Sequence, residues 1–108
     1  MTLTYHDYLK IENLLDIQVP RSDPPEHDET LFIIIHQTYE LWFKQFIHEM
    51  DRTEQLLTID DLWGCIATLK RMRMVMKTLV QQVDILETMT PLSFLSFRDR
   101  LDTASGLQ

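Results

Sequence analysis

Two pairs of residues combine an aromatic ring with a polar group at helical spacing. Phe32 precedes His36 by four residues, and Phe94 precedes Arg98 by the same interval. Residues four apart lie on one face of a helix, so each pair would place a ring beside a polar group. A flat indole amino acid requires aromatic walls, one acceptor for its ring N–H and a forked donor for its carboxylate. The two pairs are therefore candidates for the binding site of such an amino acid.

Spacing alone leaves simpler interpretations open for these residues. A histidine on an apolar helix is more often a hydrogen-bonded core residue than part of a site, and Arg98 could pair with Asp102 on the surface. The aromatic stripe along the same stretch is more typical of a core than of a cofactor pocket. Its members are Phe32, Tyr39, Trp42, Phe43 and Phe46.

The positions of histidine, cysteine and glycine disfavour other kinds of site. The four histidines are His6, His27, His36 and His48. None has an acidic residue three positions before it, which a di-metal carboxylate bundle requires, and none has zinc-site spacing. Cys65 has no cysteine partner, and Gly64 and Gly106 stand too far apart to form a phosphate-binding loop. We predict no metal site made by the side chains of this chain alone.

Composition and charge narrow the class of protein. The 108 residues carry 17 acidic and 10 basic side chains, a net charge of −7, which disfavours nucleic acid as a partner. Hydrophobic residues make up 44%, while glycine occurs 2 times and proline 4 times, so long uninterrupted helices are favoured. The longest apolar run, Leu31–Ile35, is far shorter than the roughly 20 residues of a membrane span.

The single cysteine and the N-terminal residues bear on the compartment. Cys65 cannot form an internal disulfide, and the first residues show no basic region followed by an apolar one. We predict a reducing, cytoplasmic setting.

Capping residues and proline positions predict an all-α fold of long antiparallel helices. Thr4 and Asp7 resemble the start of a short helix, Thr58 with Asp61 the start of a second long one, and Thr90 with Pro91 the start of a third. The expected elements are a helix over 4–16, a proline-containing linker over 19–25, helices over 28–57, 58–88 and 90–101, and a loop over 102–106. Residues 1–26 would form an arm and linker, and 27–108 the helical body of one N-terminal segment.

The apolar residues of the first long helix indicate contact with further protein. Side chains on nearly every face are apolar from Leu31 to Ile35, and a rod of about 28 residues, roughly 40 Å long, would exceed a compact domain of this size. We expect this chain to pack against its own continuation or a second copy.

A run of consecutive residues within this helix resembles a known family signature. The run is His27-Asp28-Glu29-Thr30-Leu31-Phe32-Ile33-Ile34-Ile35-His36-Gln37-Thr38-Tyr39-Glu40-Leu41-Trp42-Phe43-Lys44-Gln45. It is similar to the signature of tryptophan 2,3-dioxygenases. Further matches are Leu3-Thr4-Tyr5, Tyr8-Leu9, Leu86-Glu87-Thr88-Met89-Thr90-Pro91, Phe97-Arg98-Asp99 and Ala104-Ser105-Gly106. The resemblance covers almost the whole chain.

The resemblance implies an all-helical enzyme that uses haem b and belongs to the kynurenine pathway. Such an enzyme inserts both atoms of O2 into the indole 2,3 bond of L-tryptophan, giving N-formylkynurenine. His36 matches the distal histidine that accepts a hydrogen bond from the indole N–H. Phe32 matches a ring lining the pocket, Phe94 an aromatic position, and Arg98 the guanidinium that binds the substrate carboxylate.

The resemblance also implies contacts at both ends of the chain. Tyr5, Tyr8 and Leu9 match residues that reach into the pocket of a neighbouring subunit within a homotetramer. Ser105 and Gly106 match the loop that closes over the distal side of the haem. A proline-rich linker suits an arm that crosses an interface, because it cannot fold back as helix.

The chain departs from the family pattern at its C-terminal end. Leu107 stands where an aromatic residue is common, and no histidine in the chain matches the proximal haem ligand of the family. We expect a piece of a longer enzyme, inactive alone, whose haem ligand lies outside it. Two alternatives stay open: a haem enzyme that acts on another indole, and a non-catalytic helical interaction or oligomerisation module.

Overall fold

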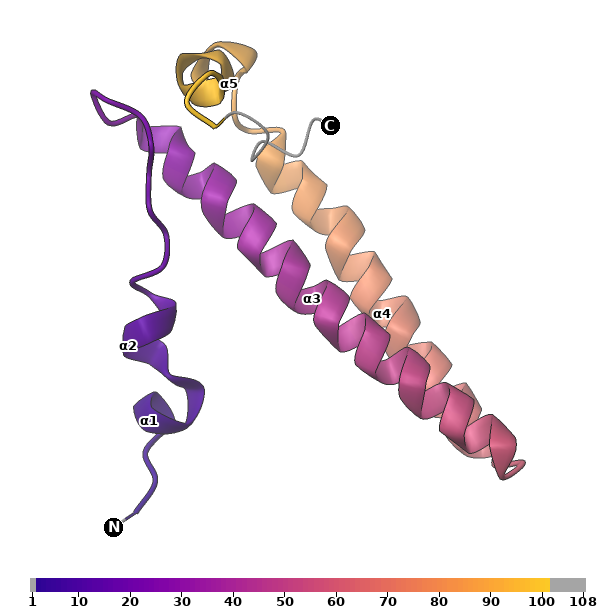
Figure 1. The fold of residues 1–108 in the computed structure, drawn as a ribbon. Helices are drawn as coiled ribbons and strands as arrows, with labels where there is room; N and C mark the ends of the chain where they lie inside the picture. Colours follow the sequence, from indigo (N-terminus) through magenta and orange to yellow (C-terminus); the bar gives the residue numbers. More distant parts are fainter. Residues whose placement is uncertain (1, 102–108) are drawn as a thin grey trace. The chain divides into compact units, whose positions relative to one another are not determined.

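In a computed structural model, residues 2–101 are described, and over that range the chain forms helices and no strand. The helices are α1 (Tyr5–Leu9), α2 (Ile11–Leu14), α3 (His27–Thr58), α4 (Leu62–Leu86) and α5 (Pro91–Arg98), shown in Figure 1. This confirms the predicted all-α class. No helix within these residues is both long and apolar enough to cross a membrane.

The chain divides into two compact units. One comprises the residues up to Ile34 together with those from Pro91 onward, and the other comprises Ile35–Thr90. Helix α3 begins in the first unit and continues through the second. The division into an arm over 1–26 and a helical body over 27–108 stays a prediction.

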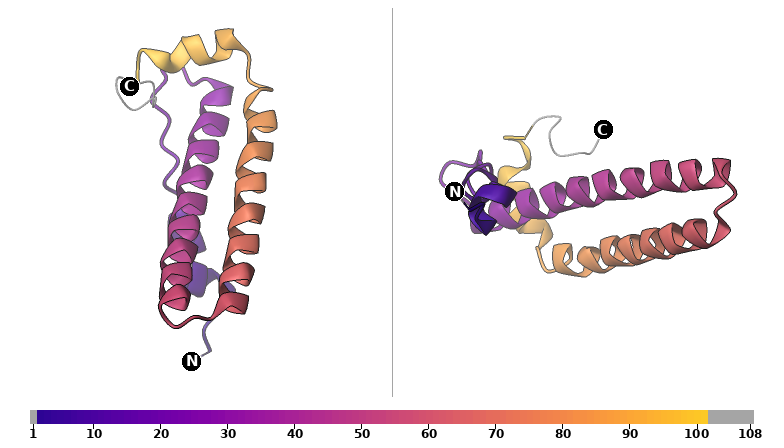
Figure 2. Two further views of the ribbon diagram at one scale, coloured as in Figure 1. Left: turned by 90° about the vertical axis from the view of Figure 1, so that its right-hand side faces the viewer. Right: turned by 90° about the horizontal axis from the view of Figure 1, so that it is seen from below.

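The second unit is a helical hairpin. Figures 1 and 2 show the longer part of α3 and the whole of α4 running side by side in opposite directions. Along each helix, buried or half-buried residues recur at alternating intervals of three and four, as in a coiled-coil seam. On α3 they are Ile35, Tyr39, Trp42, Phe46, Glu49, Thr53 and Leu56. On α4 they are Cys65, Thr68, Met72, Val75, Leu79, Gln82 and Leu86.

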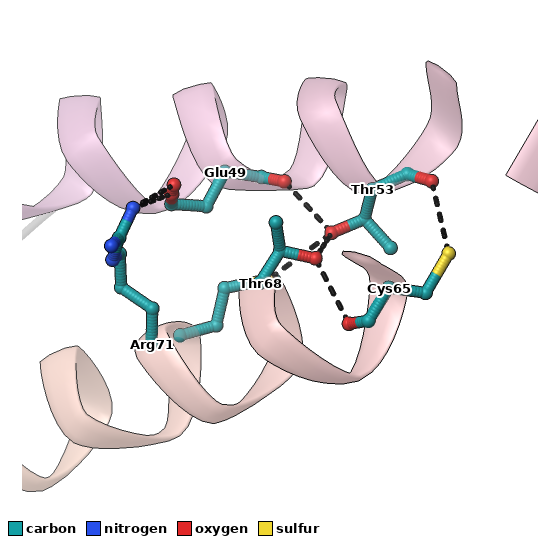
Figure 3. A network of polar contacts seen from close by, with 6 residues as sticks. Glu49, Thr53, Cys65, Thr68 and Arg71 are labelled. Carbon is teal, nitrogen blue, oxygen red and sulfur yellow. Dashed lines mark hydrogen bonds and ion pairs between the residues drawn. The ribbon is translucent and has the colours of Figure 1, made fainter. Parts of the chain in front are cut away.

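Polar groups interrupt this seam near the closed end of the hairpin (Figure 3). The Thr53 and Thr68 hydroxyl oxygens lie 2.5 Å apart and share one hydrogen bond, and the Thr53 oxygen also lies 2.9 Å from the Glu49 carbonyl oxygen. The Thr68 hydroxyl donates to the Cys65 carbonyl at 3.0 Å, and the Cys65 Sγ lies 3.8 Å from the Thr53 carbonyl oxygen. Each hydroxyl therefore has a partner, so its burial leaves no hydrogen bond unmade.

An ion pair with unequal burial lies one turn further along. Arg71 Nη1 lies 3.2 Å from Glu49 Oε1, while the side chain of Arg71 is 66% exposed and that of Glu49 only 5%. The Glu49 carboxylate is therefore buried away from water, whereas most of the Arg71 side chain remains in contact with water. Since a buried charge requires a partner, the pair constrains how α4 aligns with α3 more than it stabilises the hairpin.

One predicted helix start differs from the structure. The N-cap of α4 is Asp61, whose side chain accepts from the Gly64 amide at 2.9 Å, so the expected start at Thr58 is wrong. The Thr58 hydroxyl instead donates to the Gln55 carbonyl at 2.6 Å, which completes the end of α3. A Cβ at Gly64 would lie 2.7 Å from Asp61 Oδ2 and 2.9 Å from Leu56 Cδ1. Glycine therefore leaves room here for the cap and for a core leucine.

The N-terminal segment forms two short helices instead of the single helix expected over 4–16. Thr4 caps α1 as predicted, because its hydroxyl accepts from the Asp7 amide at 3.1 Å. Lys10 then adopts the left-handed conformation with φ 52°, which ends α1 and precedes α2. No residue of either helix is buried, and the backbone hydrogen bonds within this segment include local ones such as Tyr8 to Thr4 and Leu14 to Lys10.

Many large apolar side chains lie outside the hairpin seam and remain exposed. On α3 they are Ile34, Leu41, Phe43, Ile47, Met50 and Leu57. On α4 they are Leu62, Trp63, Ile66, Leu69, Met74, Met76, Val80, Val83 and Ile85. Surfaces this rich in apolar side chains are typical of contact with further protein, as the sequence indicated.

The unequal ion pair gives a prediction for the stability of the hairpin. Arg71→Ala leaves the buried Glu49 carboxylate without its cation, so we expect the free energy of unfolding to fall by about 1–3 kcal/mol. Glu49→Met removes the buried charge and leaves Arg71 in water, so we expect a change below about 1 kcal/mol. Urea unfolding measures both, with Arg73→Ala as the control for loss of an exposed arginine. A larger loss in Glu49→Met than in Arg71→Ala would contradict this account.

Candidate functional site

Three phenylalanines form a compact aromatic cluster in the first unit. The rings of Phe32 and Phe94 stack with centroids 5.5 Å apart and an interplanar angle of 30°. Phe97 meets both rings edge-on, at 5.5 Å from Phe32 and 5.6 Å from Phe94. These are favourable aromatic geometries, and they join the first turns of α3 to α5. The structure thus brings together two of the predicted site residues, Phe32 and Phe94.

Phe97 was not among the predicted site residues, although its ring contacts both Phe32 and Phe94. Phe97 is fully buried, Phe32 is 8% exposed and Phe94 is half-buried. The available signal was the interval of three between Phe94 and Phe97, which places both rings on one face of a short helix. Phe97 therefore anchors α5, and the neighbouring Phe94 keeps part of its ring surface accessible.

Arg98 ends α5 and presents its side chain to solvent. It follows the buried Phe97 directly, and its carbonyl accepts from the amide of the buried Leu101 at 3.1 Å. A cation in the last turn of a helix interacts favourably with the helix dipole. Its guanidinium is therefore placed at the surface by two buried neighbours. The alternative pairing with Asp102 lies outside the described residues.

A short strap of chain connects the start of α3 to the turn that follows α5. The strap consists of Arg21, Ser22 and Asp23, and its Asp23 carbonyl accepts from Arg100 Nη2 at 3.1 Å. At its other end, the Arg21 and Ser22 amides donate to the Glu29 carboxylate at 2.7 and 2.8 Å. The linker expected from its prolines is therefore bound at two points.

The Glu29 carboxylate is the buried acceptor of this arrangement. Its residue is 0% exposed, and besides the two amides it accepts from the Ser22 hydroxyl at 2.6 Å. Burial raises the pKa of Glu29, but the bonds from the Ser22 hydroxyl and from the Arg21 and Ser22 amides, with the Arg21 charge, outweigh it. The net effect lowers the pKa below its ordinary value, so Glu29 is ionised at neutral pH.

His36 belongs to the second unit, one helical turn after Phe32 on α3. Its ring is half-buried and meets Tyr39 edge-on at a centroid distance of 6.5 Å. The Tyr39 ring stacks on Phe43 at 6.1 Å, and its hydroxyl donates to the Leu79 carbonyl at 3.2 Å. These contacts restrict the orientation of the tyrosine beside the imidazole.

The aromatic stripe along α3 is only partly a core, which corrects the simpler interpretation. Phe32 is buried, but Tyr39, Trp42 and Phe46 are half-buried and Phe43 is 45% exposed. Phe32 packs against the rings of α5, and Tyr39, Trp42 and Phe46 belong to the seam between α3 and α4.

The remaining site residues of the prediction lie at the two ends of the chain. Tyr5 and Tyr8 are each 70% exposed and Leu9 is 44% exposed. Ser105 and Gly106 lie outside the described residues. Their predicted contacts with a neighbouring subunit and with a cofactor stay predictions.

The donor groups of the described residues bear on which cofactor the chain could hold. Residues 2–101 contain no cluster of three or more histidine, cysteine, aspartate or glutamate side chains arranged to bind a metal ion. His6, His27 and His48 are exposed on the surfaces of α1 and α3. Of the two stacked rings, Phe94 is half-buried and Phe32 is buried.

Comparisons with known proteins show which family the chain is similar to. The model of the tryptophan 2,3-dioxygenase family matches residues 1–108. The tryptophan 2,3-dioxygenase of Herpetosiphon aurantiacus is 55% identical over 106 residues, which cover 98% of this chain and 41% of the relative. That of Anaeromyxobacter sp. is 52% identical over 106 residues (98% and 39%), and that of Nocardioides sp. 50% over 110 residues (98% and 41%). The chain thus spans about two fifths of the length of these relatives.

The lowered pKa of Glu29 predicts how stability depends on pH. Its contribution is fully present above the ordinary glutamate pKa of about 4.3 and is lost as the pH falls through the lower folded-state value. Glu29→Gln cannot accept from all three donors, so we expect a loss of about 1–3 kcal/mol at pH 7.

Urea unfolding between pH 7 and pH 3 checks this prediction. The difference between the parent and Glu29→Gln should shrink as the pH falls through the acidic range. Glu54→Gln, at an exposed position of α3, is the matched control. A difference that stays constant over the whole range would contradict the lowered pKa.

Proposed function

Because the chain belongs to the tryptophan 2,3-dioxygenase family, we propose that it supplies the substrate-binding side of a haem-dependent dioxygenase. The enzyme would open the indole 2,3 bond of L-tryptophan with O2 to give N-formylkynurenine, in the kynurenine pathway. The observation that carries this proposal is the family match over residues 1–108, together with 55% identity to a tryptophan 2,3-dioxygenase over 106 residues.

The aromatic cluster would provide the wall against which the indole ring packs. Phe94 stacks on Phe32 and remains half-buried, so part of its ring is available to a ligand. Phe97 is fully buried behind both rings and fixes their arrangement. A rigid aromatic wall loses little side-chain entropy on binding, which favours a flat ligand.

Arg98 would bind the substrate carboxylate. A guanidinium is always charged and offers two parallel N–H donors that match the two carboxylate oxygens. Its position directly after Phe97 and one turn after Phe94 is consistent with a ligand that carries both a ring and a carboxylate. Binding at both ends would fix the orientation of the amino acid, which is the main catalytic contribution of such residues.

His36 would accept a hydrogen bond from the indole N–H. Neutral imidazole has one acceptor nitrogen, and the edge-on contact with Tyr39 limits how the ring can turn. The indole ring would then be held at its N–H by His36 while Arg98 holds the carboxylate. We propose that these two residues converge on opposite ends of one tryptophan molecule.

Haem b is the proposed cofactor. We assign Phe32, Ser105 and Gly106 to the cofactor by their match to the family motif. We assign no residue of this chain as the ligand of the haem iron, since His36 is assigned to the substrate and the other histidines are exposed. When bound, the haem would supply the activation of O2. Burial of the substrate among aromatic rings would exclude water from the reacting atoms.

We also propose a homo-oligomer, with the N-terminal arm as one of its contacts. Tyr5, Tyr8 and Leu9 are large, mainly apolar side chains of α1, and all three are exposed. The arm would carry these side chains to the pocket of a neighbouring subunit in a tetramer. A cytoplasmic location is the corresponding expectation, because Cys65, the one cysteine of these 108 residues, is a buried free thiol.

The first experiment measures turnover by the haem-loaded enzyme. Formation of N-formylkynurenine from L-tryptophan, followed by its absorbance, is expected for the full-length enzyme that contains this chain. Binding of tryptophan without any turnover would instead support the interaction module, and turnover of other indoles alone would support the related enzyme.

Arg98→Ala tests the assignment of the carboxylate site. Losing a charge-assisted bidentate contact worth about 1.5–3 kcal/mol should raise the KM for tryptophan at least about tenfold. The same substitution should have little effect on binding of tryptamine, which has the indole ring without the carboxylate. Equal effects on both compounds would remove Arg98 from this role.

His36→Ala tests the assignment of the indole N–H contact. We expect a loss of rate of about tenfold with weaker tryptophan binding, because water can replace the imidazole only in part. The melting temperature should stay close to that of the parent, since the imidazole is half-buried. Unchanged steady-state kinetics would contradict the contact, and Tyr39→Phe, which removes only the bond to the Leu79 carbonyl, serves as the comparison.

A further inference from the structure

Arg100 occupies a special position in the first unit. It lies two residues after Arg98, in the turn that follows α5, and its own amide donates to the Phe97 carbonyl at 3.1 Å. Its side chain reaches Asp23, 77 positions earlier in the chain, where Nη2 donates to the backbone carbonyl at 3.1 Å. The turn that carries Arg98 is thereby tied to a distant segment.

The segment that Arg100 contacts is itself held firmly. The amides of Arg21 and Ser22, and the hydroxyl of Ser22, donate to the fully buried Glu29 carboxylate at 2.6–2.8 Å. The Ser22 hydroxyl also accepts from the Glu26 amide at 2.9 Å. The Asp23 carbonyl therefore belongs to a strap that is fixed to the first turn of α3, and hydrogen bonds to a charged carboxylate are the stronger kind.

The inner side of the same turn is fixed by apolar packing. Phe97 is fully buried in the aromatic cluster, and Leu101 is 9% exposed while its amide donates to the Arg98 carbonyl. Packing of these two residues restrains translation of the turn. A hydrogen bond from Arg100 on the outer side restrains its rotation about the axis through Phe97 and Leu101, and that rotation would redirect the side chain of Arg98.

We propose that Arg100 is a positioning residue that sets the direction of the Arg98 guanidinium through the strap formed by Arg21, Ser22 and Asp23. This rests on the proposed function, in which Arg98 binds the carboxylate of the substrate. The guanidinium of Arg100 has no contact with substrate in this proposal. Its contribution is to hold the turn that carries Arg98. Misplacement of a binding group by about 1 Å can severely weaken its interaction with the ligand.

Loss of the Arg100 contact should affect ligands with and without a carboxylate differently, whereas a general loss of stability would affect both alike. Redirecting Arg98 should weaken ligands that carry a carboxylate and leave ligands without one unaffected. In Arg100→Ala we expect the Kd of L-tryptophan, measured by calorimetry on the haem-loaded enzyme, to rise about tenfold. The Kd of tryptamine should stay within about twofold, and the KM for tryptophan should rise while kcat changes by less than about threefold.

Conservative substitutions and a matched control complete the experiment. Arg100→Lys and Arg100→Gln can each donate one hydrogen bond to the Asp23 carbonyl, so both should recover most of the affinity for tryptophan. These two variants carry the test if Arg100→Ala does not fold. Arg73→Ala, which removes an exposed arginine of α4, should leave the affinity for both ligands unchanged.

Three results would overturn the proposal. They are an unchanged Kd of tryptophan in Arg100→Ala, an equal weakening of tryptophan and tryptamine, and no recovery in either conservative variant. If Arg98→Ala selectively weakens tryptophan but Arg100→Ala does not, the carboxylate assignment stands and the role of Arg100 is wrong. If the unsubstituted enzyme neither binds nor converts tryptophan, the proposed function fails and the role of Arg100 fails with it.

Discussion

Burial of Phe97 against Phe32 and Phe94 is the constraint on which the candidate site depends. The three rings come from segments more than sixty positions apart in the chain, and their centroids lie within 5.5–5.6 Å of one another. Burial of a phenylalanine side chain stabilises a fold by about 1.5–3 kcal/mol. Burial of Phe97 therefore favours packing of α5 against the start of α3. The positions of Phe94 and Arg98 follow from that one contact.

Polar groups give this contact its orientation. An aromatic cluster restrains distance well and rotation poorly, whereas hydrogen bonds are directional. Glu29 binds the strap at one end and Arg100 binds it at the other, so the turn after α5 is fixed by both kinds of interaction. The hairpin of the second unit uses the same combination. Its apolar seam holds α3 and α4 together, while the contacts of Thr53 with Thr68 and of Glu49 with Arg71 select one alignment.

Helices α3 and α4 keep large apolar surfaces exposed in this chain. A two-helix hairpin can bury one stripe of each helix, but α3 and α4 carry apolar residues on further faces. Relatives whose length this chain covers to 39–41% have additional sequence of their own. The proposed pocket would therefore combine residues of this chain, such as Phe94 and Arg98, with surroundings that complete it.

Sequence by itself determined the helical class, the extent of α3, the cap at Thr4, the start of α5 near Pro91 and the family. These features depend on local propensity, on proline and on a long run of matching residues, all of which can be recognised without knowing any distant contact. Tertiary structure decided what local patterns leave open. It moved the cap of α4 to Asp61, divided the first helix at Lys10 and buried Phe97. It also paired Glu29 with Ser22 and Arg100 with Asp23, because those choices depend on which distant segments meet and on which polar groups would otherwise be buried without a partner.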